Sequence, residues 1–290
     1  MVVLLCPDPA GHMRCQSTLL FITWLLFGSL GPIAAANDNY PYGGRQAAMG
    51  NATVAVYDFW ALGHNQAGLA KLQRPAAGFY FENRFMVREM GLGAAAVALP
   101  MRNGVFGLSI SYFGYSQYHE SKAGLAYARS FGNRLSAGLQ FNYMYTFIGG
   151  NYSSHAGKVT FEAGVIYEVL PGLYVATHLF NPTKTKLATV DNLYDEFIPT
   201  IMRFGAAYHF SDKILITIET EKDINKEPVI KAGLEYQISK RLFVRGGIGT
   251  NPTLNAFGFG VHTGIFIIDL STSFHQVLGY SPQASILIEF

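Results

Sequence analysis

Apolar and polar residues alternate along most of this chain, from about residue 77 to its end. Residues 134–148 show the pattern, because one face carries Leu139 among other apolar side chains and the next face carries Gln140. A second example places Leu234 and Glu235 on opposite faces in the same way. A period of two residues is typical of an extended strand. We therefore predict strands with one apolar and one polar face, with Leu139 and Leu234 on the apolar face.

Fourteen such segments follow one another. Connections after the even-numbered segments are tight, including 102–104 and a turn near Ile268, whereas several after the odd-numbered ones are longer, such as 181–197. An even strand number with short turns on one side is typical of bacterial outer-membrane barrels. We predict an all-β fold, a transmembrane antiparallel β-barrel of about 14 strands over residues 77–290, with both termini periplasmic. The predicted strands are 77–85, 90–101, 104–118, 122–131, 134–148, 157–170, 172–181, 199–211, 213–222, 228–239, 241–250, 255–267, 269–278 and 282–290.

Composition distinguishes this barrel from a soluble secreted sandwich, whose strands also alternate. Half of the 290 residues are hydrophobic and only 14% are charged, against about 25% in a soluble domain. The net charge of +2 comes with no basic block, so we expect no nucleic-acid partner. The last segment alternates and stops at Phe290, which resembles the C-terminal signal read by the barrel-insertion machinery. Outer-membrane lipid and that machinery are therefore expected partners.

The N-terminus is typical of an export signal. Arg14 precedes an apolar run over 19–30, and the small residues 34–36 follow it. A charged region, an apolar region and an A-x-A site make a secretory signal peptide, here residues 1–36, although a retained membrane anchor is the alternative. Both cysteines, Cys6 and Cys15, precede the predicted cleavage site. The mature chain would then have no disulfide and no cysteine metal site, and we expect no cofactor.

Residues 37–76 do not fit a strand. They contain a Gly- and Ala-rich stretch over 43–52, an acidic-aromatic stretch over 57–62 and the sequence Asn-Gln-Ala-Gly-Leu-Ala over 65–70. Glycines and alanines permit close packing in a narrow lumen, and a barrel of this size encloses a cavity. We predict an ordered plug. Its motif residues are Gly43, Gly44, Arg45, Met49, Gly50, Asn51, Asp58, Asn65 and Gly68.

Asn51, Asp58 and Asn65 have two possible roles in this plug. They could cap turns and satisfy backbone groups, or they could contact a ligand directly. Arg45 or Asp58 should also pair with charges on the wall.

This segment resembles the N-terminal hatch of the FadL-like outer-membrane barrel superfamily, in which an Asn-Pro-Ala-Gly-Leu-Ala motif occurs; here Gln66 replaces the proline. Length and spacing are most similar to the PorV/PorQ branch of Bacteroidota. The resemblance implies a non-enzymatic accessory subunit that binds other envelope proteins of a secretion or assembly complex. The alternative is a FadL-like channel for uptake of hydrophobic small molecules.

Candidate chemistry is sparse. The Ser-His pairings at 153–155 and at Ser273 and His275 have no identifiable acidic partner, and no metalloprotease histidine spacing occurs. We therefore expect no enzyme activity. Charges of both signs fall on the polar strand faces, which predicts either ion-paired networks between wall and hatch or a water-filled lumen. They are Glu82, Arg84, Glu162, Glu168, Arg203, Glu219, Glu221, Lys231, Glu235 and Arg245.

Overall fold

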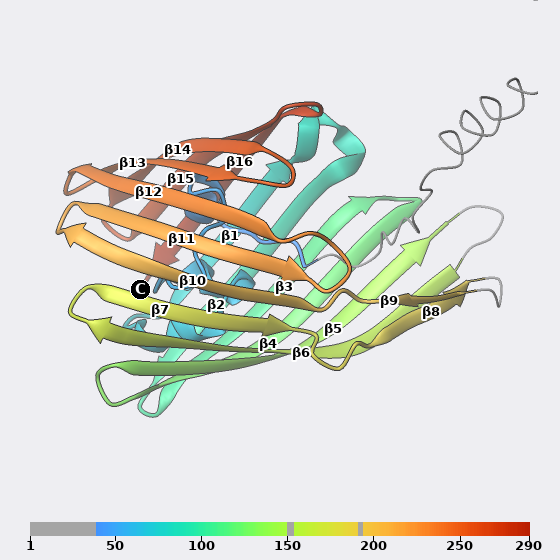
Figure 1. The fold of residues 1–290 in the computed structure, drawn as a ribbon, viewed down its shortest axis with the longest axis horizontal. Coiled ribbons are helices and arrows are strands. Elements are labelled where there is room, and N and C mark those ends of the chain that lie inside the picture. The colour runs from blue at the N-terminus through green and yellow to red at the C-terminus, as the bar shows by residue number, and fades with distance from the viewer. Residues whose placement is uncertain (1–38, 150–153, 191–193) are drawn as a thin grey trace, which may run out of the picture. The chain divides into compact units, whose positions relative to one another are not determined.

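The chain forms a closed antiparallel β-barrel whose lumen holds the segment that precedes the first strand (Figure 1). The computed structural model describes residues 39–149, 154–190 and 194–290. Fourteen strands close the wall, and β1 pairs with β16 to complete it. The predicted fold class and strand number are confirmed. The predicted signal peptide, residues 1–36, lies outside the described residues.

The wall strands agree with the predicted segments except at several ends. They are β1 (Ala76–Asn83), β2 (Gly91–Met101), β3 (Gly104–Tyr115), β4 (Tyr118–Phe131), β5 (Leu135–Ile148), β6 (Ser154–Leu170), β7 (Leu173–Phe180), β10 (Ile201–Ser211), β11 (Ile214–Asp223), β12 (Val229–Ser239), β13 (Leu242–Gly249), β14 (Leu254–Thr263), β15 (Phe266–His275) and β16 (Gly279–Glu289).

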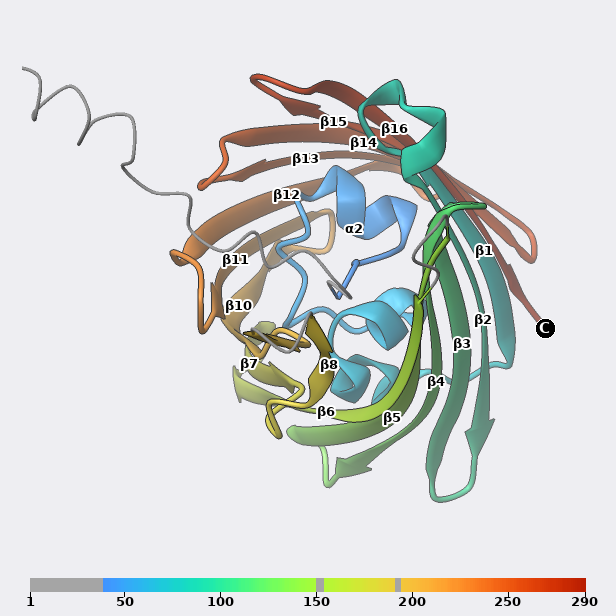
Figure 2. The same ribbon diagram turned by 90° about the vertical axis from the view of Figure 1, so that its right-hand side faces the viewer.

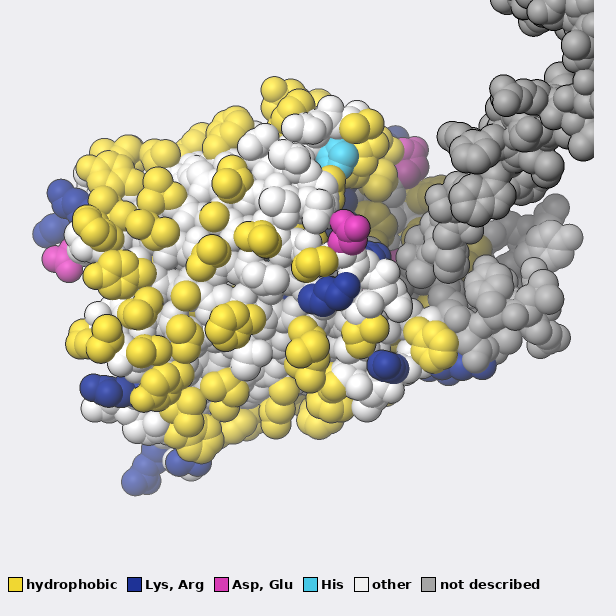
Figure 3. Space-filling model, viewed as in Figure 1, with side chains coloured by type: hydrophobic (Ala, Val, Ile, Leu, Met, Phe, Trp, Pro, Cys, Tyr) yellow, Lys and Arg dark blue, Asp and Glu magenta, His cyan; other side chains and the backbone are white. Residues whose placement is uncertain are grey.

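Apolar side chains cover the outside of the wall, and polar ones line the lumen. Leu139 is 53% exposed on the outer face, whereas the adjacent Gln140 is fully buried. Leu234 is 48% exposed and Glu235 only 8%, so the predicted strand faces are confirmed. Figure 3 shows apolar side chains spread over the face of the barrel in view, with Lys and Arg mainly toward its two ends. An outward apolar band with an inward polar face is the arrangement of a membrane-spanning barrel.

One tight turn differs from its prediction. The turn expected near Ile268 lies instead at Gly264 and Ile265, because Thr263 pairs with Phe266 across the β14–β15 hairpin. Gly264 has φ +58°, a backbone conformation that glycine adopts at little cost. Residues 265–268 are all apolar, so alternation does not locate the turn within them.

The connection predicted as a long loop over 181–197 contains a hairpin. Its strands, β8 (Lys186–Val190) and β9 (Tyr194–Phe197), pair with each other and stand apart from the wall order. Residues 181–197 show no alternation that would distinguish a short hairpin from a polar loop. The hairpin lies at the end of the barrel where odd-numbered predicted strands finish, which we call the long-connection mouth.

The hatch, residues 39–75, lies inside the barrel (Figure 2). It contains α2 (Gly44–Ala48), which packs on β13 to β16, and the 3-10 helices η1 (Phe59–Gly63) and η2 (Gln66–Lys71). The helix η2 packs on β3 to β6. Two further 3-10 turns, η3 (Arg84–Met86) and η4 (Arg88–Met90), connect β1 to β2 at the long-connection mouth. Among the residues that the structure describes, no helix is long and apolar enough to cross a membrane.

The two described ends of the barrel unit lie at opposite mouths. Asn39 lies at the long-connection mouth, where it lines one cavity together with Asp223 and Asn251. Phe290 lies at the other end, where its backbone N–H donates to the Pro75 carbonyl oxygen at 2.9 Å. The hatch thus crosses the lumen from one mouth toward the other. That both termini of the mature chain are periplasmic stays a prediction, since residues 37 and 38 lie outside the described part.

Candidate functional site

Two predicted motif residues cap the hatch helices. The Asp58 carboxylate accepts a hydrogen bond from the Ala61 backbone N–H at 2.9 Å, at the start of η1. The Asn65 side chain accepts from the Ala67 N–H at 3.2 Å, at the start of η2, and donates to the Val54 carbonyl oxygen at 2.7 Å. Such side chains satisfy N–H groups that a helix start leaves free. Backbone capping is thus a role that the structure shows for both residues.

Arg45 joins the hatch to the wall through what we call the Arg45 latch, formed by Arg45, Asp58 and Glu235. Its guanidinium donates to both Glu235 carboxylate oxygens, at 2.8 and 2.7 Å, and to Asp58 Oδ2 at 3.2 Å. Glu235 also accepts from Arg245, which reaches Asp269 at 2.6 Å. Burial alone would lower the pKa of Arg45, but Glu235 and Asp58 raise it above its usual range. The predicted pairing of the hatch with wall charges is confirmed here.

Glu162 is the centre of a second network. Its fully buried carboxylate accepts hydrogen bonds from Lys122 Nζ at 2.8 Å and from Asn142 Nδ2 at 2.8 Å on the wall. Gln66 of the hatch donates to it at 2.9 Å, and His178 Nε2 lies 3.1 Å away. A buried carboxylate is tolerated when charge and hydrogen bonds compensate it. Gln66, the departure from the family's proline, therefore has a contact that proline could not make.

The network continues along the wall to strand β12. Arg203 donates to the other nitrogen of the His178 imidazole at 3.2 Å and to Glu221 at 2.6 Å. Lys231 reaches Glu221 at 2.9 Å and Glu219 at 3.4 Å. The second Glu219 oxygen accepts from the backbone N–H of hatch residue Val54 at 2.8 Å. The lumen charges are therefore ion-paired with one another and with the hatch. Of the two predicted arrangements, this is the ion-paired network and not the water-filled lumen.

Wall glycines allow the hatch to approach the strands closely. A Cβ on Gly247 would lie 2.6 Å from the Met49 carbonyl oxygen, and one on Gly233 would lie 2.8 Å from the same atom. A Cβ on Gly164 would lie 2.8 Å from Asn65 Cγ. Sequence reasoning missed these positions. The sequence feature that could have identified them is a glycine on the polar face of a strand, because any side chain there would point into the lumen.

The remaining motif residues lie within this packing. The Gly44 N–H donates to Ser285 Oγ at 3.1 Å, and Met49 is fully buried. Gly43, Gly50 and Asn51 adopt positive φ values of 123°, 64° and 57°. The last of the motif residues, Gly68, packs closely as well, since a Cβ at this position would lie 2.6 Å from the Val56 carbonyl oxygen. Phe290 is exposed, and its role in insertion stays a prediction.

The apolar side chains on the lumen face of the wall are mostly used in packing. Ile166 and Leu215 pack with hatch residues, and Met144 packs with Phe180 near the β7 end. The Phe113 ring lies tilted against the Tyr40 ring, with 4.5 Å between the ring centroids. Phe243 lines a cavity at the tight-turn end. Little free apolar surface therefore remains along this lumen.

Ser273 and His275, the candidate pair that lies wholly within the described residues, have no catalytic arrangement. Ser273 accepts a hydrogen bond from Gln283 at 3.0 Å, while His275 Nδ1 accepts from two backbone N–H groups. Ser153 of the other pair lies outside the described residues. No group of three or more potential metal ligands occurs in the described ranges.

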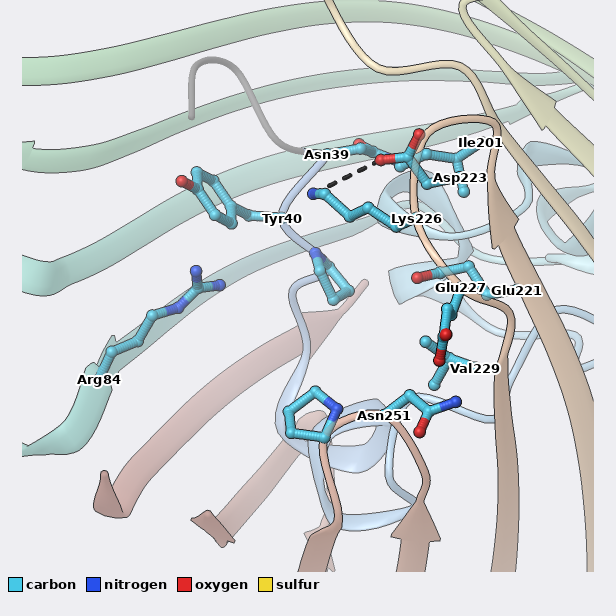
Figure 4. A pocket seen from close by; sticks show the side chains of 12 residues that line it. Asn39, Tyr40, Arg84, Ile201, Glu221, Asp223, Lys226, Glu227, Val229 and Asn251 are labelled. Atoms are coloured by element: carbon cyan, nitrogen blue, oxygen red, sulfur yellow. Dashed lines mark ion pairs between the residues drawn. The ribbon is translucent and has the colours of Figure 1, made fainter. Parts of the chain in front are cut away.

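Cavities lie at both ends of the hatch. The mouth cavity, about 590 Å³, lies at the long-connection mouth, where hatch residues Asn39 and Tyr40 face Arg84 and Asp223 (Figure 4). A smaller cavity of about 220 Å³ adjoins it and shares Arg84. A third, about 300 Å³, lies near the tight turns and is lined by Arg45, Trp60 and other residues. The hatch therefore separates a cavity at one mouth from a cavity at the other.

These features define a class, the transmembrane β-barrel with a plugged lumen. Among solved structures, CymD, described as a monoaromatic hydrocarbon channel, is similar with a TM-score of 0.65 and 12% identity over 88% of this chain and 98% of its own. The P. putida toluene transporter TodX matches with a TM-score of 0.62 and 12% identity, over 87% and 99%. A FadL homologue of Pseudomonas aeruginosa matches with 0.62 and 11%, over 88% and 98%.

The chain therefore has the fold of the FadL-like outer-membrane barrels. At these identities the likeness concerns the fold alone. No protein-family profile matches the sequence, and no curated protein matches it.

Proposed function

We propose that this chain is an outer-membrane channel of the FadL-like kind, through which a small molecule passes from the long-connection mouth to the tight-turn end. The observation that carries the proposal is the position of the hatch between two cavities, of about 590 and 300 Å³. Longer connections of outer-membrane barrels face outward and short turns face the periplasm. Passage would then be uptake, with the hatch as its gate.

The fold likeness supports this proposal over the PorV/PorQ interpretation. CymD and TodX are described as a hydrocarbon channel and a toluene transporter. A channel also agrees with the absence of a catalytic arrangement among the described residues. Hydrophobic cargo, however, receives little support from a lumen whose apolar side chains are packed away.

A variant whose hatch can be fixed to the wall by a disulfide tests the proposal. A Cβ on Gly44 would lie 2.8 Å from Ser285 Oγ, so the double variant Gly44→Cys/Ser285→Cys places two thiols within disulfide reach. Both native cysteines precede residue 37, so this would be the one disulfide of the mature barrel. Cells producing it should take up labelled toluene or a labelled dipeptide slowly when oxidised and rapidly when reduced.

The two single-cysteine variants are the controls for that experiment, and their uptake should not respond to the reductant. Uptake that is the same with and without the barrel, for both probes, would contradict the channel function.

The second candidate function is an accessory subunit that binds envelope proteins of a secretion or assembly complex, as in the PorV/PorQ branch of Bacteroidota. Two observations favour it: the ion-paired lumen and the β8–β9 hairpin, which lies outside the wall order. Mild-detergent purification from native membranes, followed by mass spectrometry, tests it. Stoichiometric partners that depend on residues 186–197, with no effect of the locked hatch on uptake, would favour this function over the channel.

A further inference from the structure

The mouth cavity has a charge pattern that a hydrocarbon would not use. Arg84 and Tyr40 lie on one side of it, whereas Glu221, Asp223 and Glu227 lie on the opposite side together with Lys226, which pairs with Asp223 (Figure 4). Its volume of about 590 Å³ lies within the range of roughly 300–1,000 Å³ found for small-molecule sites. The cavity therefore offers an anion-binding side and a cation-binding side within one small-molecule volume.

Arg84 is held in place before any ligand arrives. Its guanidinium carbon lies 4.2 Å from the centroid of the Tyr40 ring and 5.2 Å from that of Phe113. Its Nε lies 3.3 Å from Glu82. Within the described part of the chain, its two terminal nitrogens donate no hydrogen bond. A guanidinium fixed on aromatic faces, with its paired donors free, suits bidentate binding of a carboxylate.

The backbone after Arg84 is strained. Phe85 and Met86 both have left-handed conformations, with φ 54° and 57°, which cost conformational energy for residues with a Cβ. The Phe85 N–H donates to Ser281 Oγ at 2.9 Å, which ties this connection to strand β16. Strain of this kind is commonly retained at sites that position a functional group. Here it fixes the direction in which Arg84 projects.

On the opposite side, Glu227 is the acid available to a ligand. Glu221 is occupied by Arg203 and Lys231, and Asp223 lies 3.4 Å from Lys226. Glu227 makes no ion pair or hydrogen bond within the described ranges. It therefore offers an uncompensated carboxylate to an ammonium group.

Asn39 contributes a buried hydrogen-bond donor that has no partner in the described structure. The residue is only 4% exposed, and it lines the mouth cavity. Its Oδ1 accepts from Lys122 Nζ at 2.7 Å, whereas its Nδ2 has no hydrogen-bond partner in the described structure. A buried amide N–H left unpaired costs free energy, and an oxygen atom of a ligand would satisfy it.

We propose that the mouth cavity binds a small zwitterion, an amino acid or short peptide, with its carboxylate on Arg84 and its ammonium group on Glu227. Asn39 Nδ2 donates to an oxygen of the same molecule, and the apolar parts of Tyr40 and Val229 contact its side chain. The inference rests on the proposed channel function, and it names a cargo that differs from the hydrocarbons of the similar structures.

Calorimetric titration of the complete barrel in detergent tests this site with four probes. Alanyl-valine should bind. Its N-acetyl form, which has no ammonium group, and its C-terminal amide, which has no carboxylate, should bind less tightly, the amide by about tenfold. Toluene should bind more weakly than the free dipeptide.

Two variants then assign each end of the ligand. Arg84→Gln should weaken alanyl-valine about tenfold and leave the amide unchanged. Glu227→Gln should weaken alanyl-valine about threefold, because this side chain is exposed, and leave the N-acetyl form unchanged. Arg88→Gln and Glu89→Gln, exposed charges of the same β1–β2 connection, are the matched controls and should change neither affinity.

Equal binding of the free and blocked dipeptides to the unaltered protein would overturn the proposal, and this comparison stands even where a variant fails to fold. Binding of toluene alone would overturn it as well, while leaving a channel possible. Dipeptide binding without any uptake in the locked-hatch experiment would retain the site and contradict the channel.

Discussion

Arg45 and Glu235, which are 190 positions apart in the chain, form a two-bond ion pair, with Arg45 nitrogens 2.7 and 2.8 Å from the two carboxylate oxygens. Within the described residues, this pair joins the hatch to the wall at a shorter distance than the Lys71–Glu168 pair, which is 3.6 Å. Asp58 pairs with Arg45, and Arg245 pairs with Glu235 and with Asp269. The Arg45–Glu235 pair is therefore one part of a chain of charged side chains that begins in α2 and ends on β15. Its strength should control how firmly the hatch is held.

The first prediction concerns Arg45→Gln, which removes the hatch charge from this chain. Leaving Glu235 and Asp58 without that cation should destabilise hatch docking by about 3 kcal/mol. Trp60, which is 2% exposed, is the only tryptophan after residue 36 and reports on the hatch by fluorescence. Its urea midpoint should fall in the variant. Arg102→Gln, at an exposed turn, is the control; an equal fall in both would exclude a specific role for the latch.

The second prediction concerns two adjacent glycines of β13. Gly247→Ala places a methyl group 2.6 Å from the Met49 carbonyl oxygen, whereas the nearest atom to a Cβ on Gly246 is 3.9 Å away. The hatch backbone must shift in the first variant and not in the second. We expect Gly247→Ala to expose the hatch to limited proteolysis and Gly246→Ala to behave as the parent. Equal proteolysis of the two variants would show that the hatch does not lie against β13 as described.

The third prediction concerns the lipid face. Leu139→Arg places a charge among exposed apolar side chains inside the β5 span and should cost about 2–4 kcal/mol of folding free energy. Leu135→Arg lies on the same face at the first residue of β5 and should cost about 0–1 kcal/mol, since the interface is near. The folded fraction, measured by heat-modifiable gel migration, gives the comparison. A smaller loss for Leu139→Arg than for Leu135→Arg would contradict the assigned depth.

The strand faces could be predicted because a period of two leaves no ambiguity between neighbours such as Leu139 and Gln140. The ends of the strands could not be predicted in this way. As a result, two charged side chains of the lumen were not recognised. Lys122 was placed at the start of a predicted strand, yet β4 begins at Tyr118 and puts it in the Glu162 network. Asp269 was placed beside a predicted turn, yet β15 begins at Phe266 and Asp269 pairs with Arg245.

Partners within the lumen could not be predicted either. The hatch motif indicated that Arg45 or Asp58 meets a wall charge, but alternation gives each strand residue a face and not a neighbour. Ten wall charges were candidates, and the barrel closure decides that Glu235 is the one. The cavity at Arg84 was missed for the same reason, because it brings together residue 39, the β1–β2 connection and the β11–β12 connection.

The fourth prediction is a pH dependence of hatch docking. Burial, together with the nearby Arg203 and Lys231, lowers the pKa of His64 well below its usual 6.5. The neutral imidazole therefore belongs to the docked hatch, and the exposed histidine of the undocked state binds a proton more readily. Docking free energy should be constant above about pH 6.5 and fall progressively as the pH drops below it.

Trp60 fluorescence in urea, measured at pH 7.5 and pH 5, follows this change. The His64→Gln variant keeps a polar side chain near Thr53 Oγ1, which lies 3.3 Å from His64 Nδ1, and should show a smaller loss between the two pH values. The same loss in parent and variant would assign the pH dependence to other groups.

Planar-bilayer conductance tests the central claim, a hatch that closes the barrel. The intact mature barrel should be nearly silent, because the hatch fills the lumen and its charges are paired to the wall. Deletion of residues 37–72 should leave a folded barrel, shown by heat-modifiable migration, with a steady conductance well above that of the intact protein. A large, steady conductance from the intact barrel, unchanged by the deletion, would contradict the closed hatch and the gated channel built on it.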